Sequence, residues 1–115
     1  MTDDYVLDAS ALLAFLNAEA GADRVAEVLL NHRCAVLAVN LTEVLSRLLD
    51  WQVPLSEAVT RLDALDFRTE PYTRTLALDA AALRDSTRAI GLSLADRACL
   101  ALAQSLGATA LTADR

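Results

Sequence analysis

The chain has 115 residues, 55% of them hydrophobic, which is enough to bury one core in a single domain. Its formal net charge is −6 and its ten basic residues are all arginines, so chemistry that requires a lysine, such as a Schiff base, is excluded. No uncharged apolar run is long enough to span a bilayer, and the acidic start Met-Thr-Asp-Asp lacks the basic residues of a signal peptide. We therefore expect a cytoplasmic protein that does not contact a membrane.

Apolar runs alternate with amphipathic stretches along the chain, which predicts a parallel α/β sheet with helices on its faces. Strands are expected at 5–7, 34–39, 67–70 and 108–112. Helices are expected at 9–17, 21–30, 41–49, 54–65, 73–90 and 92–106. Asn40 would cap the third helix, and Gly91 and Gly107 would end the last two.

Four acidic residues are expected at one edge of this sheet. Asp8 and Asp114 directly follow strands, and Glu43 and Asp96 fall in the first turns of their helices. In a parallel sheet the carboxyl ends of all strands lie at the same edge, and the helices that follow begin there. The four carboxylates would therefore lie close together.

Helix capping offers a separate explanation for most of these residues. Asp before a helix is a common N-cap, and Asn40-Leu-Thr-Glu43 and Ser93-Leu-Ala-Asp96 both have the pattern of a capping box. Capping does not explain why the carboxylates share one edge, where like charges repel unless a cation lies among them. Such a cation would also offset the acidic net charge, which otherwise disfavours nucleic acid. Oxygen ligands alone suit Mg²⁺ or Mn²⁺.

The cysteines and the single histidine do not suggest a metal site of another kind. Cys34 and Cys99 lie in apolar segments and are expected to be buried thiols without metal-ligand spacing. His32 follows a leucine-rich helix and is expected at the surface near its end. A single histidine excludes catalysis by a histidine pair.

The acidic residues lie in four segments, namely Val6-Leu-Asp-Ala-Ser10, Asn40-Leu-Thr-Glu-Val44, Leu92-Ser-Leu-Ala-Asp-Arg97 and Leu111-Thr-Ala-Asp-Arg115. In this order, over nearly the whole chain, they resemble the motifs of the PIN-domain ribonucleases, specifically the VapC-type toxins of toxin–antitoxin pairs. The resemblance implies a PIN-like three-layer α/β fold, with a central parallel sheet of about four strands flanked by helices, in one domain over residues 1–115. The family normally continues past the Ala-Asp-Arg segment into a last short helix and strand, which we expect to be absent here.

The resemblance also implies an activity, the hydrolysis of RNA phosphodiester bonds by a metal-dependent endoribonuclease. The residues it implies as catalytic and as ligands of Mg²⁺ or Mn²⁺ are Asp8, Glu43, Asp96 and Asp114. Those it implies as contacts to the substrate or supports of the ligands are Ser10, Asn40, Arg97 and Thr112. Asp8 and Asp96 would be the main ligands, and Asp114 would contribute least. The implied partners are an RNA substrate, a cognate antitoxin protein and a second copy of the chain in a homodimer.

Two other classes of protein remain as alternatives. A phospho-accepting receiver domain also gathers aspartates at strand ends, but it needs a lysine late in the chain, and this sequence has none. A catalytically inactive PIN-like module that only binds a partner is the second alternative. All four acidic positions are filled here, which favours an active enzyme over that module.

Overall fold

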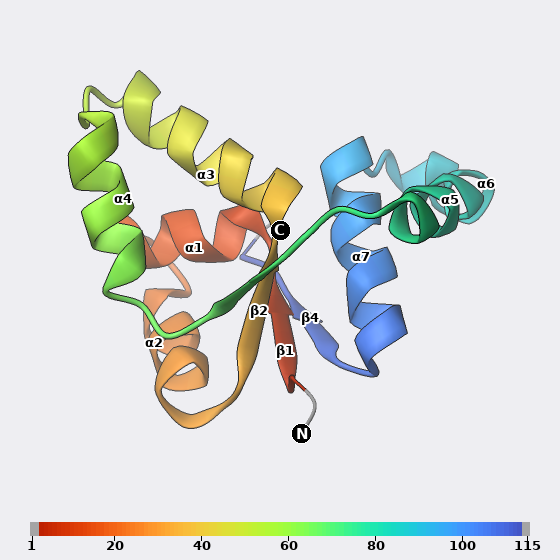
Figure 1. Cartoon of the computed structure of the whole chain (residues 1–115), viewed down its shortest axis with the longest axis horizontal. Helices are drawn as coiled ribbons and strands as arrows, with labels where there is room; N and C mark the ends of the chain where they lie inside the picture. Colours follow the sequence, from red (N-terminus) through yellow and green to blue (C-terminus); the bar gives the residue numbers. More distant parts are fainter. Residues whose placement is uncertain (1–2, 114–115) are drawn as a thin grey trace.

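The computed structural model describes residues 3–113, which fold around a sheet of four parallel strands. The strands, in chain order, are β1 (Tyr5–Leu7), β2 (Cys34–Leu37), β3 (Arg68–Glu70) and β4 (Thr109–Leu111). In space their order is β3-β2-β1-β4, and every neighbouring pair is parallel. The carboxyl ends of β1, β2 and β4 lie at the upper side of the view in Figure 1, at one edge of the sheet.

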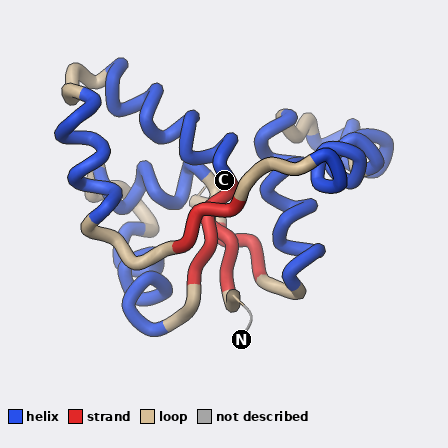
Figure 2. Tube along the Cα trace, viewed as in Figure 1, coloured by secondary structure: helices blue, strands red, loops and turns tan. Residues whose placement is uncertain are grey.

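Helices cover both faces of this sheet. The first layer consists of α1 (Ala9–Leu16), α2 (Ala22–Asn31), α3 (Ala38–Asp50) and α4 (Leu55–Asp63). The second consists of α5 (Arg74–Ala82), α6 (Arg84–Thr87), the 3-10 helix η1 (Arg88–Ile90) and α7 (Leu94–Leu106). Figures 1 and 2 show the sheet nearly edge-on between the two layers, so the predicted three-layer α/β fold is confirmed. Within residues 3–113, none of the helices combines the length and apolar character needed to cross a membrane.

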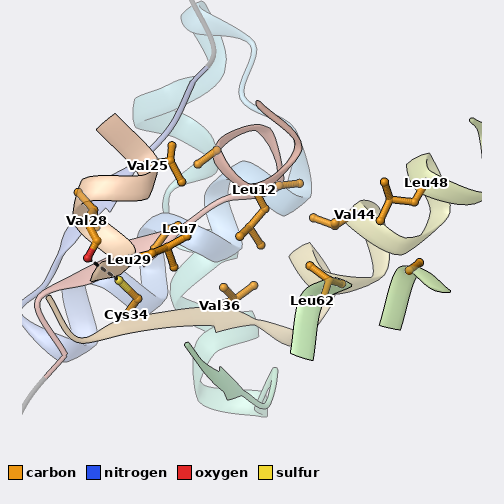
Figure 3. Close-up of a cluster of buried hydrophobic side chains, with 13 residues drawn as sticks. Leu7, Leu12, Val25, Val28, Leu29, Cys34, Val36, Val44, Leu48 and Leu62 are labelled. Carbon is orange, nitrogen blue, oxygen red and sulfur yellow. Dashed lines mark hydrogen bonds between the residues drawn. The ribbon is translucent and has the colours of Figure 1, made fainter. Parts of the chain in front are cut away.

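The two layers have different cores, because successive residues of a strand point to opposite faces. On the first face, Leu7 and Val36 pack among leucine and valine side chains of α1 to α4, as Figure 3 shows. On the second face, Val6 and Leu37 meet a cluster rich in alanine. The alanines and the cysteine of α7 are small, so this helix lies close to the sheet, as the sequence predicted.

The boundary between β2 and α3 differs from the prediction. The strand ends at Leu37 rather than at residue 39, and α3 already begins at Ala38 with no side-chain cap. Asn40 is therefore not an N-cap but a buried residue of the first turn, 1% exposed. A continuous apolar run does not reveal by its periodicity where a strand gives way to a helix.

The single helix predicted over residues 73–90 is also wrong, because the structure divides it into α5, α6 and η1. The break falls at Leu83, whose carbonyl accepts hydrogen bonds from the hydroxyls of Ser86 (3.2 Å) and Thr87 (2.7 Å). Such bonds from serine and threonine back to the preceding turn compete with the helical pattern and bend it. The predicted end at Gly91 holds, since this residue has φ +67° directly after η1.

Candidate functional site

A cavity of about 500 Å³ lies at the carboxyl edge of the sheet. Three of the four predicted acidic residues line it together: Asp8 from the end of β1, Glu43 from α3 and Asp96 from α7. These side chains are far apart in the sequence, and the parallel topology brings them to one place. The expectation that their carboxylates share an edge is therefore correct for this part of the set.

Asp8 is both a helix cap and a wall of the cavity. Its Oδ1 accepts the backbone N–H of Ala11 at 2.9 Å and the hydroxyl of Ser10 at 2.7 Å, and the residue is 8% exposed. Both bonds use the same oxygen, so capping does not occupy Oδ2. The capping bond holds the carboxylate in one orientation at the edge of the cavity. Asp8 can therefore be both the N-cap of α1 and a residue of the site, the two roles that the sequence suggested.

Asp96 forms the capping box that the sequence predicted for α7. Its backbone N–H donates to the hydroxyl of Ser93 at 3.1 Å, and its Oδ2 accepts the backbone N–H of Ser93 at 3.1 Å. The side chain is half-buried at the start of a long helix packed on the sheet. Like Asp8, it is thus a positioned carboxylate with one oxygen committed to the backbone.

Asn40 connects the other two acidic walls of the cavity. Its side-chain amide donates to Oε1 of Glu43 at 3.3 Å and to the carbonyl of Ala95, the residue before Asp96, at 3.3 Å. The amide therefore ties α3 to the start of α7 and holds the Glu43 carboxylate near that junction. This is the contact that replaces the predicted Asn40–Glu43 capping box.

Ser10 and Thr112 link the first helix to the end of β4. The Ser10 hydroxyl gives its one proton to Asp8, so at 3.0 Å from the Thr112 hydroxyl it acts as the acceptor. It also accepts the backbone N–H of Ala113 at 2.9 Å. Ala113 itself lines the cavity, so the segment that follows β4 reaches the site. Asp114 lies outside the described residues.

Arg97 is placed differently from the other predicted residues. It is 8% exposed, and its Nη1 donates to the carbonyl of Ala80 on α5 at 3.2 Å. The side chain thus ties α7 to its neighbouring helix in the second layer, and it does not contribute to the described lining of the cavity.

Three functional candidates were missed by the sequence analysis, namely Glu19, Arg47 and Trp51, all of which line the cavity. Arg47 on α3 and Trp51 at its C-cap follow Glu43 at steps of four residues, so the helical period was a signal that could have found them. Glu19 lies in the turn after α1, where Ala18 has φ +50°, and no local pattern predicts its position.

The electric field of the site reaches the buried thiol of Cys99. Burial raises the pKa of Cys99 to about 12, and the negative charges of Asp8, Asp96 and Glu43 add to the shift in this order. The three carboxylates are thus near enough to act together on one group. Both cysteines are free and buried, and His32 is exposed at the end of α2, as predicted.

The donor set of the cavity suits a hard divalent cation, because its ligating side chains are carboxylates with neither histidine nor cysteine among the described lining residues. These side chains lie farther apart than the ligands of a bound metal ion would. Within residues 3–113 no group of three acidic, histidine or cysteine side chains is close enough to hold a metal ion. The chemistry of a Mg²⁺ or Mn²⁺ site fits these residues.

A family model described as the PIN domain matches residues 5–115. The match spans nearly the whole chain and includes Asp8, Glu43, Asp96 and Asp114. The chain therefore belongs to the PIN domain family. No curated protein sequence matches it.

Solved structures agree with this fold. A toxin–antitoxin complex from Klebsiella pneumoniae has 21% identity and a TM-score of 0.77, covering 96% of this chain and 87% of the other. VapC20 from Mycobacterium tuberculosis, described as a sarcin–ricin loop cleaving toxin, has 20% identity and a TM-score of 0.77, covering 96% and 90%. VapBC2 from Rickettsia felis, bound to a DNA fragment from its promoter, has 16% identity and a TM-score of 0.70, covering 96% and 87%.

Proposed function

We propose that this chain is a metal-dependent endoribonuclease and the toxin of a toxin–antitoxin pair. The observation that carries the proposal is one cavity, within a PIN domain, lined by the carboxylates of Asp8 after β1, Glu43 on α3 and Asp96 on α7. The similarity to a sarcin–ricin loop cleaving toxin and to a toxin–antitoxin complex supports it. A module that only binds a partner would have no need for three carboxylates in one acidic cavity, since their mutual repulsion disfavours it.

Asp8, Glu43 and Asp96 would hold Mg²⁺ or Mn²⁺ at the edge of the sheet, together with Asp114 if it extends the set. When bound, the cation lowers the pKa of a water molecule and stabilises the negative charge that develops on the phosphate. The backbone bonds of Asp8 and Asp96 fix these side chains before the substrate arrives, which is what precise ligands require. The Asn40 amide keeps the Glu43 carboxylate oriented on the opposite wall.

The reaction is the attack of a water oxygen on the phosphorus of an RNA phosphodiester, with departure of the 3′ oxygen of the preceding nucleotide. The products carry a 5′-phosphate and a 3′-hydroxyl. Proton transfer by a histidine pair is not available, because the chain has a single histidine and it lies at the end of α2. Cleavage through the ribose 2′-hydroxyl is therefore disfavoured, and the termini of the products distinguish the two routes.

The partners of such a toxin would be a cognate antitoxin and a second copy of the chain. Exposed apolar side chains on α3 and α4 are consistent with a protein interface: Leu49 is 45% exposed, Leu55 52% and Val59 40%. Light scattering at tens of micromolar should give the mass of a dimer. A monomer at this concentration would contradict the proposed homodimer.

The decisive experiment is cleavage of an end-labelled single-stranded RNA by the purified protein with and without divalent cations. Excess EDTA should abolish cleavage, and added Mg²⁺ or Mn²⁺ should restore it. Asp8→Asn should reduce cleavage by about 100-fold or more, while asparagine still caps α1 and preserves the melting temperature. Asp85→Asn is the matched control, since this aspartate lies on α6 with an exposed side chain. Undiminished activity in EDTA, or equal activity of Asp8→Asn and Asp85→Asn, would refute the mechanism.

A further inference from the structure

One wall of the cavity is formed by a single face of α3. Glu43, Arg47 and Trp51 recur at every fourth residue and all three line the cavity. At 1.5 Å per residue they span about 12 Å, roughly the length of three stacked bases. Only Glu43 belongs to the proposed metal ligands, so the rest of this wall has no role in the mechanism above.

Arg47 brings a positive charge to an otherwise acidic cavity. Among the described lining residues it is the one cationic side chain, beside Asp8, Glu19, Glu43 and Asp96. It forms no ion pair with any residue in the described part of the chain. A guanidinium in this position is available to a ligand phosphate, which arginine binds through two N–H groups.

The sequence offers a direct comparison for Arg47. Glu57 and Arg61 on α4 have the same spacing as Glu43 and Arg47, with the glutamate four residues ahead. On α4 the pair closes, with 3.0 Å between Arg61 Nη2 and Glu57 Oε1. On α3 the Glu43 carboxylate instead accepts from Asn40, and Arg47 stays available. The four-residue spacing between glutamate and arginine therefore does not by itself explain where the Arg47 side chain lies.

Trp51 is the only aromatic residue among the described lining residues, and it is 40% exposed. It stands at the end of α3, where the chain turns through Gln52 with φ +70°. The N–H groups of Gln52 and Val53 donate to the carbonyls of Leu49 (2.9 Å) and Leu48 (3.0 Å), which closes the helix firmly. The indole is thus presented to solvent from a fixed backbone.

We infer that Arg47 and Trp51 form a nucleotide subsite beside the carboxylates, which takes an unpaired nucleotide of single-stranded RNA. Arg47 holds a phosphate next to the scissile bond, and the Trp51 indole stacks on a base. An aromatic face beside a cationic group is the usual combination for binding single strands, and a base within a duplex is not free to stack on it. The inference rests on the proposed function, which identifies the ligand as RNA. It adds that Arg47 and Trp51 are the residues that select a single strand over a duplex.

Trp51 is the single tryptophan of the chain, so its fluorescence reports on the subsite directly. The test uses the Asp8→Asn variant in EDTA, which keeps the RNA intact, and titrates it with a short single-stranded RNA or with the same RNA annealed to its complement. The single strand should quench the emission and the duplex should not. Equal quenching by the duplex, or binding of the single strand without quenching, would overturn the assignment.

Affinity for fluorescently labelled single-stranded RNA separates the two side chains. In the Asp8→Asn background, Trp51→Ala should weaken binding about tenfold or more, and Trp51→Phe should retain most of the affinity. Arg47→Gln should weaken binding and reduce the salt dependence by about one phosphate contact. Arg61→Gln and Tyr72→Ala are the matched controls on exposed surfaces and should bind as the background does.

The failure of this inference can be told apart from failure of the proposed function. If Trp51→Ala and Arg47→Gln bind RNA as tightly as the background, the subsite is refuted even when the wild-type chain cleaves RNA, and this wall would serve a protein partner. If the wild-type chain does not cleave RNA with Mg²⁺ or Mn²⁺ but the single strand still quenches Trp51, the nuclease is refuted and the subsite stands. Absence of any binding to the single strand overturns the subsite.

Discussion

Helices α3 and α7 have the same length, thirteen residues, and each brings one acidic side chain to the cavity, but they are used differently. Helix α7 buries six residues, from Arg97 to Ala103, and begins with a capping box. Helix α3 buries only Asn40, Val44 and Leu48, and begins without a side-chain cap. Figure 1 shows α7 along the sheet and α3 rising beyond the end of β2.

The difference separates two requirements of a site. A carboxylate that must stay in place is best carried by a helix fixed through packing, and α7 meets this requirement with a single residue at its first turn. A surface that must meet a polymer needs an open helical face, and α3 offers Glu43, Arg47 and Trp51 on one side. The Asn40 amide joins the two helices where these requirements meet.

The sharpest test of this comparison replaces the acidic residue of each helix by its neutral amide. Asp96→Asn should lower kcat/KM for RNA cleavage by about 100-fold or more, because a fixed ligand is lost. Glu43→Gln should lower it by roughly tenfold, because this longer side chain lies on the helix with fewer buried residues and its Oε1 accepts from a side-chain amide rather than from the backbone. Melting temperatures control for folding. Equal losses would show that the two helices contribute equally fixed ligands.

The tight packing of α7 predicts that it does not tolerate added volume. Ala101 is 1% exposed in the alanine-rich cluster that α7 shares with the sheet and with α5, so Ala101→Leu should destabilise the fold by about 1–3 kcal/mol. Gln104 is exposed on the same helix, and Gln104→Leu should change the stability by less than about 0.5 kcal/mol. Urea denaturation measures both variants. A near-neutral Ala101→Leu would mean that α7 is packed less tightly in this cluster than its alanines suggest.

The Cys99 thiol of α7 predicts a dependence of stability on alkaline pH. The folded-state pKa is raised from 9.0 to about 12, chiefly by burial, so the stabilisation is fully present below pH 9 and is lost as the pH rises toward 12. The loss should approach about 1.4 kcal/mol per pH unit above 9. Denaturation of the wild type and of Cys99→Ala between pH 8 and 10 checks this. The variant should show the shallower slope, and parallel slopes would contradict the assignment.

Much of the fold could be predicted because its signals are local. Apolar runs located β1, β2 and β4, the short mixed segment 67–70 was expected as a strand, and the Ser93–Asp96 capping box was read from four consecutive residues. The start of α3 was not predicted, because a continuous apolar run hides where the strand gives way to the helix. The break at Leu83 was not predicted, because it involves hydroxyl bonds from Ser86 and Thr87 back to the Leu83 carbonyl. The Asn40 contact to the Ala95 carbonyl, 55 residues away, was not predicted either, since no local pattern reveals it.

The candidate site, like the fold, could be predicted only in part. The parallel topology alone predicted that Asp8, Glu43 and Asp96 meet, since it requires only that the strands end at one edge. It could not predict Glu19, whose place depends on a turn with Ala18 in the left-handed region. Nor could it predict that Arg97 faces α5, because the direction of a long side chain in a packed layer is decided by its neighbours. The metal ligation by these carboxylates, including Asp114, stays a prediction.

The smallest expected effects come from the ends of the two helices, which close in the same way. In α7 the turn residue is Gly107 with φ +64°, and Ala108 donates to the Ala103 carbonyl at 2.9 Å. In α3 the same place is taken by Gln52 with φ +70°. A side chain in this region costs about 1–2 kcal/mol, and glycine gives back part of that through its larger loss of chain entropy on folding.

Removing the glycine from one turn and introducing a glycine into the other should therefore change the stability in opposite directions. Gly107→Ala should destabilise by about 1 kcal/mol through backbone strain alone, since nothing lies within 4 Å of the added methyl group. Gln52→Gly should stabilise by less than about 1 kcal/mol, raising the melting temperature by a few degrees. Gln52→Ala controls for loss of the side chain and should leave the stability nearly unchanged. A destabilised Gln52→Gly would show that the glutamine side chain, rather than the backbone turn, holds the end of α3 and the Trp51 beside it.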